Sequence, residues 1–503
     1  MNEQVATVAS SMPAWAFLMP LAAGALVFLG RRLGRGVSQG LAVIGTLAVA
    51  VIGLAMAREA ASGRVLVGWG NELRVDALSA LLVLAIGLVG LLTAVYSLRY
   101  VQQPGLLSRV GVAAEKRLPT FYGLLLWFVG TMVWGCVTNN IIMLYVAVEA
   151  TTLTSGLLVA FYWDRKALEA GYKYLMLLTI GITFALVGCV LIYAGAVATG
   201  GVTGRGALLI SEVRSVAHLI SPSTALVAVA FLVVGFGTKA GIAPFHPWLP
   251  DAHAEAPTPI SVLLSGVMIK MAAYALARTV SMFYPRWPAL TVFLVALGVF
   301  TMVLGIVMAL VQDDLKRLLA YSSVSQIGYV LAGVGLGTYL GCFGGLYHLL
   351  NHAVIKALLF MCVGALIYAT GARRISELAG MRERMPITSA CFLVGALALA
   401  GLPPFNGFFS KLTVYLALAR AGMWWAVVLA IGAGLLTMVV LLRAARTVFW
   451  GHPASVLVAR EVPATMWVPM VVLAIACFVL GVMPQAPFPL LDRAASALAT
   501  LGR

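Results

Sequence analysis

Residues 231 to 259, FLVVGFGTKAGIAPFHPWLPDAHAEAPTP, place a lysine and a run of prolines inside one apolar segment. Lys239 comes first, and Pro244, Pro247 and Pro250 follow it. Proline removes a backbone hydrogen-bond donor and clashes with the preceding turn, so the segment predicts a helix that is interrupted there. Interrupted backbone at membrane depth is tolerated only beside protein or a water-filled cavity. The segment therefore predicts a membrane span that is broken beside a buried charge.

A second segment, ALALAGLPPFNGFFSKLTVYLALA at residues 396 to 419, has the same features in the opposite order. Pro403 and Pro404 come first here, and Lys411 follows them. Corresponding broken helices in two halves of a chain indicate inverted repeats with ion sites near the bilayer midplane. Proline kinks that only shape helix packing are the alternative, but they do not account for a lysine beside each break.

The composition of the chain indicates solvation by lipid. Of 503 residues, 62% are hydrophobic and only 10% are charged, whereas soluble domains have about 25% charged residues. The formal net charge is +16, but the basic residues lie in short clusters between apolar runs, which is typical of a membrane topology signal and not of a nucleic-acid-binding surface. No two of the six cysteines are spaced as CxxC, so neither an iron–sulfur cluster nor a disulfide framework is expected.

Fourteen apolar runs are long enough to cross the hydrocarbon core as helices. They cover approximately residues 13 to 30, 38 to 57, 77 to 98, 119 to 138, 139 to 161, 170 to 199, 224 to 247, 258 to 279, 289 to 311, 317 to 337, 339 to 369, 386 to 418, 424 to 449 and 463 to 483. The sequence thus predicts an all-α integral membrane protein. The gaps between runs are short and contain no dinucleotide-binding glycine pattern or phosphate-binding loop, so we expect no bound cofactor.

The distribution of Lys and Arg predicts the orientation. With the amino terminus outside, the inner loops hold 18 basic residues, and the outer loops and tail hold 10. Inner loops are enriched in positive charge, so both termini are predicted to lie outside. The first run is preceded by Glu3 and by no Lys or Arg, which favours a retained span over a signal sequence.

Lysines, but not arginines, occur inside the apolar runs. The 25 arginines lie in loops or at span ends, whereas five of the eight lysines lie within runs, at positions Lys173, Lys239, Lys270, Lys356 and Lys411. Burial can convert a lysine to its neutral amine, while arginine stays protonated. The segregation therefore indicates sites that gain and lose a proton. Lys173 lies near the end of its run and is equally well explained by a side chain that extends to the membrane interface.

Glu149 is the only one of the 17 acidic residues that is central to a span. A carboxylate at that depth needs a cation or a proton. A static ion pair with one lysine is the structural alternative. Because one acid cannot neutralise four deep lysines, the pattern favours a functional chain of titratable groups.

Residues 347 to 360, YHLLNHAVIKALLF, contain a row of titratable side chains. His348, His352 and Lys356 are spaced four residues apart, which places them along one helical face. Histidine titrates near neutral pH, so this row predicts a proton relay. Metal binding by the two histidines is the alternative; no cysteine or carboxylate lies close in sequence to complete a ligand set, and we predict no metal.

Polar residues in the segment LLAYSSVSQIGYV, at positions 318 to 330, accompany this row. They are Tyr321, Ser322, Ser323, Ser325 and Gln326. Their hydroxyl and amide groups would hold water along the same route. They are equally well explained as polar contacts between packed helices.

Several strings together resemble a known family. They are VAVEATTL, the segment after Lys239, DLKRLLAYSSVSQIGYV, LLNHAVIKALLF and GLPPFNGFFSK. The chain resembles, over roughly residues 75 to 450, the antiporter-like membrane subunits shared by respiratory complex I, Mrp-type cation/proton antiporters and group 4 membrane-bound hydrogenases. EATTLTSGLLVAFYWDRKALEAGYKYLML, which begins at Glu149, is most similar to the F subunit of hydrogenase 4 and its relatives.

The resemblance implies a fourteen-helix subunit with two inverted five-helix repeats, spans four to eight and nine to thirteen. The corresponding division is a three-helix segment at 1 to 118, the first repeat at 119 to 280, the second repeat at 281 to 450, and a final helix and tail at 451 to 503. It also implies other membrane subunits, peripheral redox subunits and lipid as partners, in the plasma membrane of a prokaryote.

The resemblance also assigns positions along a proton path. Glu149 matches the glutamate of span five, Lys239 the lysine of broken span seven, and Lys270 the bridging lysine of span eight. Lys411 takes the terminal position on broken span twelve, where some members have glutamate, and Gln326 stands where several relatives have histidine. The expected proton-transfer residues are Glu149, Lys239, Lys270, His348, His352, Lys356 and Lys411.

The leading hypothesis is a proton-translocating membrane subunit of a redox-driven complex, of the hydrogenase or NADH dehydrogenase type, with no catalytic centre of its own. A subunit of an Mrp-type sodium/proton antiporter is one alternative. A coupling subunit for inorganic-carbon uptake is another, and a structural anchor without transport is the third.

Overall fold

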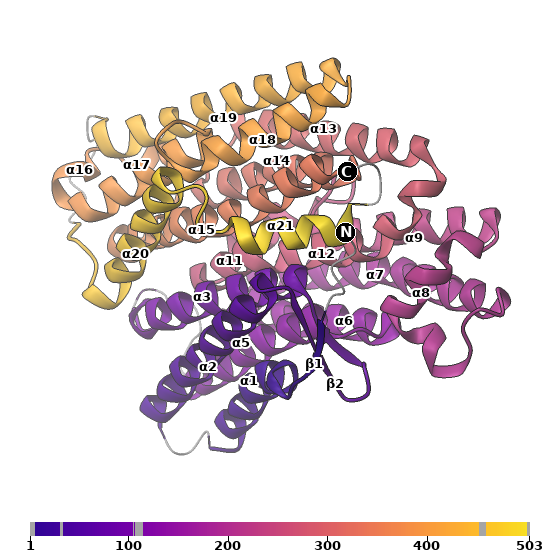
Figure 1. Cartoon of the computed structure of the whole chain (residues 1–503). Helices are drawn as coiled ribbons and strands as arrows, with labels where there is room; N and C mark the ends of the chain where they lie inside the picture. The colour runs from indigo at the N-terminus through magenta and orange to yellow at the C-terminus, as the bar shows by residue number, and fades with distance from the viewer. Residues whose placement is uncertain (1–5, 31–33, 104, 106–113, 452–458, 500–503) are drawn as a thin grey trace.

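A computed structural model of the chain describes residues 6–30, 34–103, 105, 114–451 and 459–499, except for the side chains of 114–116. Of the residues used for the orientation, Glu3, Arg31, Arg32, Arg109 and Arg503 lie outside this part of the chain. Figure 1 shows a bundle of roughly parallel helices, with α1 (Met12–Leu29) and α2 (Arg35–Ala61) along one side and α19 (Trp424–Trp450) along the other. The last two helices, α20 (Ala464–Val482) and α21 (Phe488–Leu498), return to pack against α3 (Ala77–Tyr100).

In the described part of the chain, thirteen helices are long and apolar enough to cross a membrane. They are α1 (Met12–Leu29), α2 (Arg35–Ala61), α3 (Ala77–Tyr100), α5 (Ala114–Val137), α6 (Ile141–Val159), α7 (Arg165–Ala198), α9 (Pro222–Ala240), the continuous α11–η3–α12 (Thr258–Leu263, Leu264–Met268, Ile269–Val280), α13 (Pro288–Leu310), α14 (Leu315–Gly335), α15 (Tyr339–Thr370), α19 (Trp424–Trp450) and α20 (Ala464–Val482). Shorter helices are η1 (Gly204–Leu208), α8 (Ile210–Val216), η2 (Ala217–Leu219), α10 (Trp248–Glu255), η4 (Ser281–Arg286), η5 (Ile375–Glu377), α16 (Met381–Arg384), α17 (Pro386–Ala400), α18 (Asn406–Arg420) and α21 (Phe488–Leu498). The predicted all-helical membrane fold is confirmed.

Both predicted interruptions are present. α9 ends at Ala240, and Gly241 follows with a left-handed φ of 75°, a conformation that glycine adopts without steric cost. α17 ends in the same way before Gly401, whose φ is 84°. α17 and α18 have 15 residues each and together supply the predicted twelfth span. The two breaks differ in position, because α9 runs for 19 residues before its break and α10 for only 8 after it.

The predicted span at 258 to 279 is not a uniform α-helix. Residues Leu264–Met268 form a π-helical segment between α11 and α12, directly before Lys270. π-helical segments leave backbone groups outside the regular hydrogen-bond ladder and occur often at functional sites. The apolar periodicity of the sequence carries no signal for this change.

A small sheet on the loops was not predicted. β1 (Ala6–Ala9) pairs in parallel with β2 (Arg64–Gly68), and β2 pairs antiparallel with β3 (Leu73–Val75). These strands have three to five residues, too few for the alternating pattern that identifies a strand in a sequence.

The centre of the bundle contains α11, α12 and α14. In an apolar stretch of 18 residues taken from each span, all residues of α14 and 94% of those of the α11–α12 span are buried within the chain. In α1, α7 and α20, fewer than half of these residues are buried. α14, which carries the predicted polar residues, packs against both α12 and α15, and α15 also packs against α11 and the π-helical segment before α12. The division of the chain into two repeats stays a prediction.

Candidate functional site

Six of the seven predicted proton-transfer residues are buried in the interior. Lys239, Lys270, His348, His352, Lys356 and Lys411 are at most 3% exposed. They come from α9, α12, α15 and α18, and Glu149 lies on α6, where it is half-buried. Among the described residues, no hydrogen bond joins two members of this set directly, so proton transfer between them requires hydroxyl groups or water.

Glu149 and Lys239 are connected through a threonine. Lys239 Nζ donates a hydrogen bond to Thr152 Oγ1 at 2.7 Å, and Thr152 lies one turn after Glu149 on α6. Glu149 Oε1 accepts a hydrogen bond from Thr179 Oγ1 at 3.1 Å, while Oε2 is buried with no partner among the described residues. Glu149 and Lys239 interact electrostatically, but the described residues contain no close ion pair between them. The static Glu149–lysine pair considered for this site is therefore not formed.

Tyr174 of α7 lies between Lys239 and the π-helical segment. The Tyr174 ring centre is 5.9 Å from Lys239 Nζ, a cation–π arrangement. The Tyr174 hydroxyl lies 2.5 Å from Ser155 Oγ and donates to Met268 Sδ at 3.3 Å. Thr152, Ser155 and Tyr174 were missed in the sequence, because their role depends on which helices become neighbours.

Lys270 uses the carbonyl that the π-helical segment provides. Lys270 Nζ donates to Ser265 O, and Ser265 Oγ lies 2.8 Å from Ser323 Oγ of α14. Lys270 is also within electrostatic range of Lys356. The π-helical segment therefore connects Lys270 to the polar face of α14.

Lys356 contacts the polar face of α14 directly. Its Nζ donates to Ser322 Oγ at 2.5 Å and to Leu319 O at 2.8 Å. Ser322 was among the polar residues that the sequence associated with the relay. Ser325 Oγ and both polar atoms of Gln326 are buried without a hydrogen-bond partner in the part of the chain that the structure describes.

The two histidines of α15 stack along the helix. Their ring centres are 6.0 Å apart and their planes differ by 3°. His348 Nδ1 is 3.1 Å from Ser410 Oγ, whereas His348 Nε2 and both ring nitrogens of His352 have no partner within the described ranges. His352 interacts electrostatically with Lys270, Lys356, His348 and Lys411. The predicted His-His-Lys face thus lies between Lys270 and Lys411.

Lys411 occupies the second break. Its Nζ donates to Leu399 O at 2.7 Å and to Ala400 O at 3.3 Å, which are carbonyls at the end of α17. Such carbonyls lack partners within their own helix and carry partial negative charge. The ring of Tyr329 lies between this amine, at 5.1 Å, and the ring of His348, at 5.3 Å.

His253 of α10 is a central residue that sequence reasoning missed. It is fully buried, its ring stacks on Phe360 with centres 4.7 Å apart, and neither ring nitrogen has a hydrogen-bond partner among the described residues. His253 interacts electrostatically with Lys270, Lys316 and Lys356. The only signal in the sequence was a histidine between the prolines of the first broken segment.

Lys316 corrects the sequence assignment. It was counted as an inner-loop residue, but it is 3% exposed at the start of α14, and its Nζ donates to Ala256 O at 2.5 Å. The start of α14 packs against α10, and this packing buries the amine.

Lys173 lies apart from the six buried proton-transfer residues. Its side chain is half exposed and forms an ion pair of 2.7 Å with Glu169 and a longer one of 4.0 Å with Asp251. This geometry agrees with the surface interpretation of the two considered.

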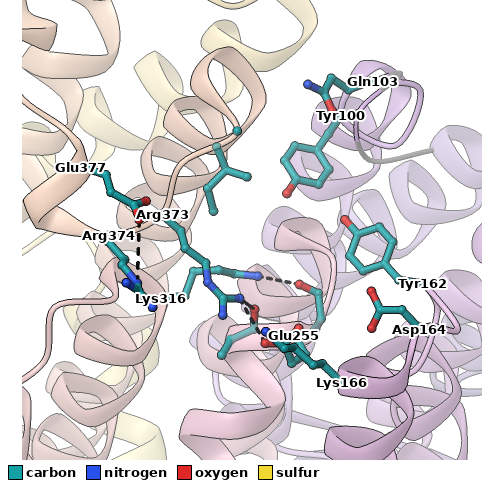
Figure 2. Close-up of a pocket in the computed structure, with 15 residues that line it drawn as sticks. Tyr100, Gln103, Tyr162, Asp164, Lys166, Glu255, Lys316, Arg373, Arg374 and Glu377 are labelled. Carbon is teal, nitrogen blue, oxygen red and sulfur yellow. Dashed lines mark hydrogen bonds and ion pairs between the residues drawn. The ribbon is translucent and has the colours of Figure 1, made fainter. Parts of the chain in front are cut away.

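A cavity of about 690 Å³ lies at the carboxyl ends of α10 and α15 (Figure 2). Tyr100 and Tyr162 lie on one side of it, and Arg373 and Arg374 on the other. Arg373 forms an ion pair of 3.1 Å with Glu255 in the cavity wall. Lys316 and Ala254, the residue after His253, also line the cavity.

The donor set does not fit a metal ion. Over the described ranges, no group of three or more His, Cys, Asp or Glu side chains lies close together. His348 and His352 have lysines and serine beside them, which are poor ligands for divalent cations.

Comparison with known proteins identifies the family. The family model described as NADH:quinone oxidoreductase/Mrp antiporter, TM, matches residues 138–437, which include both broken spans. The chain belongs to this family. Its relatives in the NADH:quinone oxidoreductase/Mrp antiporter family include NADH-quinone oxidoreductase subunit N of Desulforudis audaxviator, 32% identical over 437 residues, with 83% of each chain covered. A hydrogenase-4 component F homolog of Methylacidiphilum infernorum is 33% identical over 347 residues, covering 69% of this chain and 72% of that protein.

A solved structure has the same fold over nearly the whole chain. The membrane-bound sulfane sulfur reductase, described as an archaeal respiratory membrane complex, contains a chain that matches with a TM-score of 0.88 and 29% identity, over 97% of this chain and 98% of that chain. The predicted family resemblance is confirmed, and the chain is a multi-pass membrane protein of a family found in bacterial and archaeal membrane complexes.

Proposed function

We propose that the chain is a proton-translocating membrane subunit of a redox-driven complex whose electron-transfer chemistry resides on partner subunits. The observation that carries the proposal is the buried row of amines and imidazoles that continues from Lys270 through Lys356, His352 and His348 to Lys411. Relatives named as NADH-quinone oxidoreductase, hydrogenase-4 and respiratory complex components support redox partners.

The cavity beside Lys316 is the proposed proton intake. It is lined by Lys166, Arg373 and Arg374, which the charge distribution assigns to the inner side of the membrane. A proton would pass from the cavity by Lys316 and His253 to Lys270 and Lys356. This orientation places both termini outside, in the plasma membrane of a prokaryote.

The row then leads to the second break. Hydroxyls of Ser322 and Ser410 contact Lys356 and His348, and such groups pass protons between titratable side chains when water completes the chain. Lys411 is the proposed last member, because the carbonyls of α17 stabilise its charged form.

Glu149 and Lys239 form a separate control pair in this proposal. A carboxylate near the amine favours its protonated form, and withdrawal of that carboxylate favours proton release. Thr152 bonds the amine and lies one helical turn from the acid, so a small shift of α6 would change both interactions together.

We propose that a neighbouring membrane subunit packs against the face of α7 that lies beside Glu149. Thr179, which bonds Glu149, is exposed on the apolar outer face of α7. Polar groups in a membrane face the protein interior, a cavity or a partner far more often than lipid. Another membrane subunit therefore fits this face.

A subunit of a sodium/proton antiporter is the second candidate, because the family model also describes Mrp antiporters. The two candidates differ in the partner subunits that they require. Purification of the chain after mild detergent extraction should recover redox subunits if the first proposal is right. Recovery of membrane subunits alone, with proton movement driven by a sodium gradient, would favour the antiporter.

The direct test is proton pumping in vesicles that contain the purified complex. Lys239→Ala and Glu149→Ala should abolish proton uptake while the complex still assembles and transfers electrons. Lys173→Ala is the matched control, because Lys173 lies in a spanning helix but at the surface, and it should pump normally. Normal pumping by both Lys239→Ala and Glu149→Ala would reject the proposal.

A further inference from the structure

One face of α5 forms the floor of an apolar groove that the proton path does not use. Arg117, Thr120, Leu124 and Trp127 follow one another at intervals of three, four and three residues, which places them on one side of the helix. The walls are Phe28 of α1 and three residues at and after the end of α6, Leu157, Phe161 and Trp163. The groove encloses about 470 Å³.

Among the described residues that line this groove, Arg117 is the only charged one. Its guanidinium carbon lies 5.3 Å from the centre of the Trp163 ring. Its terminal nitrogen Nη1 is shielded from solvent and has no hydrogen-bond partner among the described residues. An unsatisfied charged donor is costly, so the site calls for an anionic acceptor at this end of the groove.

The other end of the groove is apolar. The Trp127 indole nitrogen donates to Leu21 O at 3.0 Å, outside the groove, and the Trp127 ring packs against Phe28 with centres 4.7 Å apart. From residue 117 to residue 127, a helix rises about 15 Å, which is half of the roughly 30 Å hydrocarbon core. The groove has a charge at one end and an apolar wall about as long as one leaflet of the bilayer. A phospholipid has the same arrangement of a charged head group and an acyl chain.

We propose that this groove binds one acidic phospholipid, with its phosphate on Arg117 and an acyl chain along α5 toward Trp127. Guanidinium groups bind phosphate through strong charge-assisted hydrogen bonds. Trp163, which is 56% exposed, lies beside the charge as tryptophans do at the membrane interface. Basic pockets between spanning helices are known sites for acidic lipid head groups.

The groove fits a bound lipid better than a helix of a partner subunit. The groove is bounded on both sides by helices of this chain, and its single polar requirement lies at one end, where a head group would lie. A partner helix would need to bring an anionic side chain to Arg117 and also fill the groove with apolar side chains.

Native mass spectrometry of the purified complex tests the proposal. The complex is incubated with phosphatidylglycerol or with phosphatidylcholine, and tightly bound lipids are counted. Arg117→Gln should bind one phosphatidylglycerol fewer per copy of the chain, or bind it about tenfold more weakly, as expected for the loss of one hydrogen bond to a charged group. Arg99→Gln, at an exposed arginine that does not line the groove, should match the wild type.

A second variant fills the groove and keeps the charge. Leu157→Trp changes a residue that is 48% exposed and lines the wall, so the fold should tolerate it, and it should remove the same lipid. A photoreactive benzophenone side chain in place of Leu157 should cross-link to phospholipid. Unchanged phosphatidylglycerol binding in both variants, equal retention of phosphatidylcholine, or cross-linking of position 157 to a partner subunit would overturn the proposal.

Discussion

Thr152→Val tests the contact inside the control pair of Glu149 and Lys239. Valine keeps the shape of threonine but removes the hydroxyl that accepts the 2.7 Å hydrogen bond from Lys239 Nζ. A hydrogen bond to a charged group contributes about 1.5–3 kcal/mol, and about 1.4 kcal/mol corresponds to a factor of ten. Because this contact belongs to the control pair, the pumping rate should fall by roughly 10-fold to 100-fold.

The assay separates pumping from electron transfer. The complex is reconstituted into vesicles, proton uptake is followed with a pH-sensitive dye, and electron transfer is followed in the same sample after an uncoupler is added. Thr154→Val is the matched control, because Thr154 is a mostly buried threonine of the same helix whose hydroxyl bonds only carbonyls of its own helix, Ala150 O at 2.9 Å and Thr151 O at 3.2 Å.

The comparison has a clear negative outcome. Thr152→Val should lose pumping but keep its uncoupled electron-transfer rate, and Thr154→Val should resemble the wild type in both. If the two variants pump equally well, the hydroxyl of Thr152 does not serve Lys239, and the reasoning from this hydrogen bond is wrong.

Three further predictions concern other contacts. Asp76→Asn breaks a buried ion pair with Arg278 and should lower the free energy of unfolding by about 3–5 kcal/mol, measured by thermal unfolding of the detergent-solubilised complex. Burial alone raises the pKa of Asp76, but the charge and hydrogen bonds of Arg278 outweigh this effect and hold the pKa below its usual range. The ion pair therefore stabilises the fold above the pKa that Asp76 has in the unfolded chain, and this stabilisation is lost as the pH falls through the pKa of the folded protein. The wild type should lose more stability on acidification than Asp76→Asn. Ser322→Ala removes one of two hydrogen bonds from Lys356 Nζ and should slow pumping about tenfold in the vesicle assay. His253→Phe keeps an aromatic stack but removes the imidazole, and it should stop pumping without preventing assembly; unchanged pumping would remove His253 from the path.

The sequence was sufficient to predict the membrane fold and the burial of four lysines, Lys239, Lys270, Lys356 and Lys411. Length and apolarity of the runs determine where helices cross, and the prolines and glycines after Lys239 and before Lys411 determine where two of them break. Buried lysines are equally visible, because a charged residue inside an apolar run is conspicuous without any knowledge of its neighbours.

The partners of those charges were not predictable. Thr152 meets Lys239 across 87 positions of sequence, and Ser410 meets His348 across 62. Such contacts depend on how helices are arranged around one another, and one threonine or serine in an apolar helix resembles any other. Lys316 was assigned to a loop for the same reason, since its burial depends on the packing of α10 against α14.

The apolar pattern of the sequence also did not predict local changes of the backbone. The π-helical segment Leu264–Met268 has the sequence LSGVM, which continues an apolar run and has no pattern that predicts this backbone change. The sheet of β1, β2 and β3 forms from short segments that are distant in the sequence, since Ala6 pairs with Arg64.

The central claim is that the buried amines and imidazoles form one connected path for protons. A cryo-electron microscopy map of the assembled complex, at a resolution that shows ordered water, tests it most directly. We predict water density that links Lys270, Lys356, His352, His348 and Lys411 through hydrogen bonds, and further density between Lys316 and His253. A map in which these side chains are dry and separated by apolar groups would contradict the account.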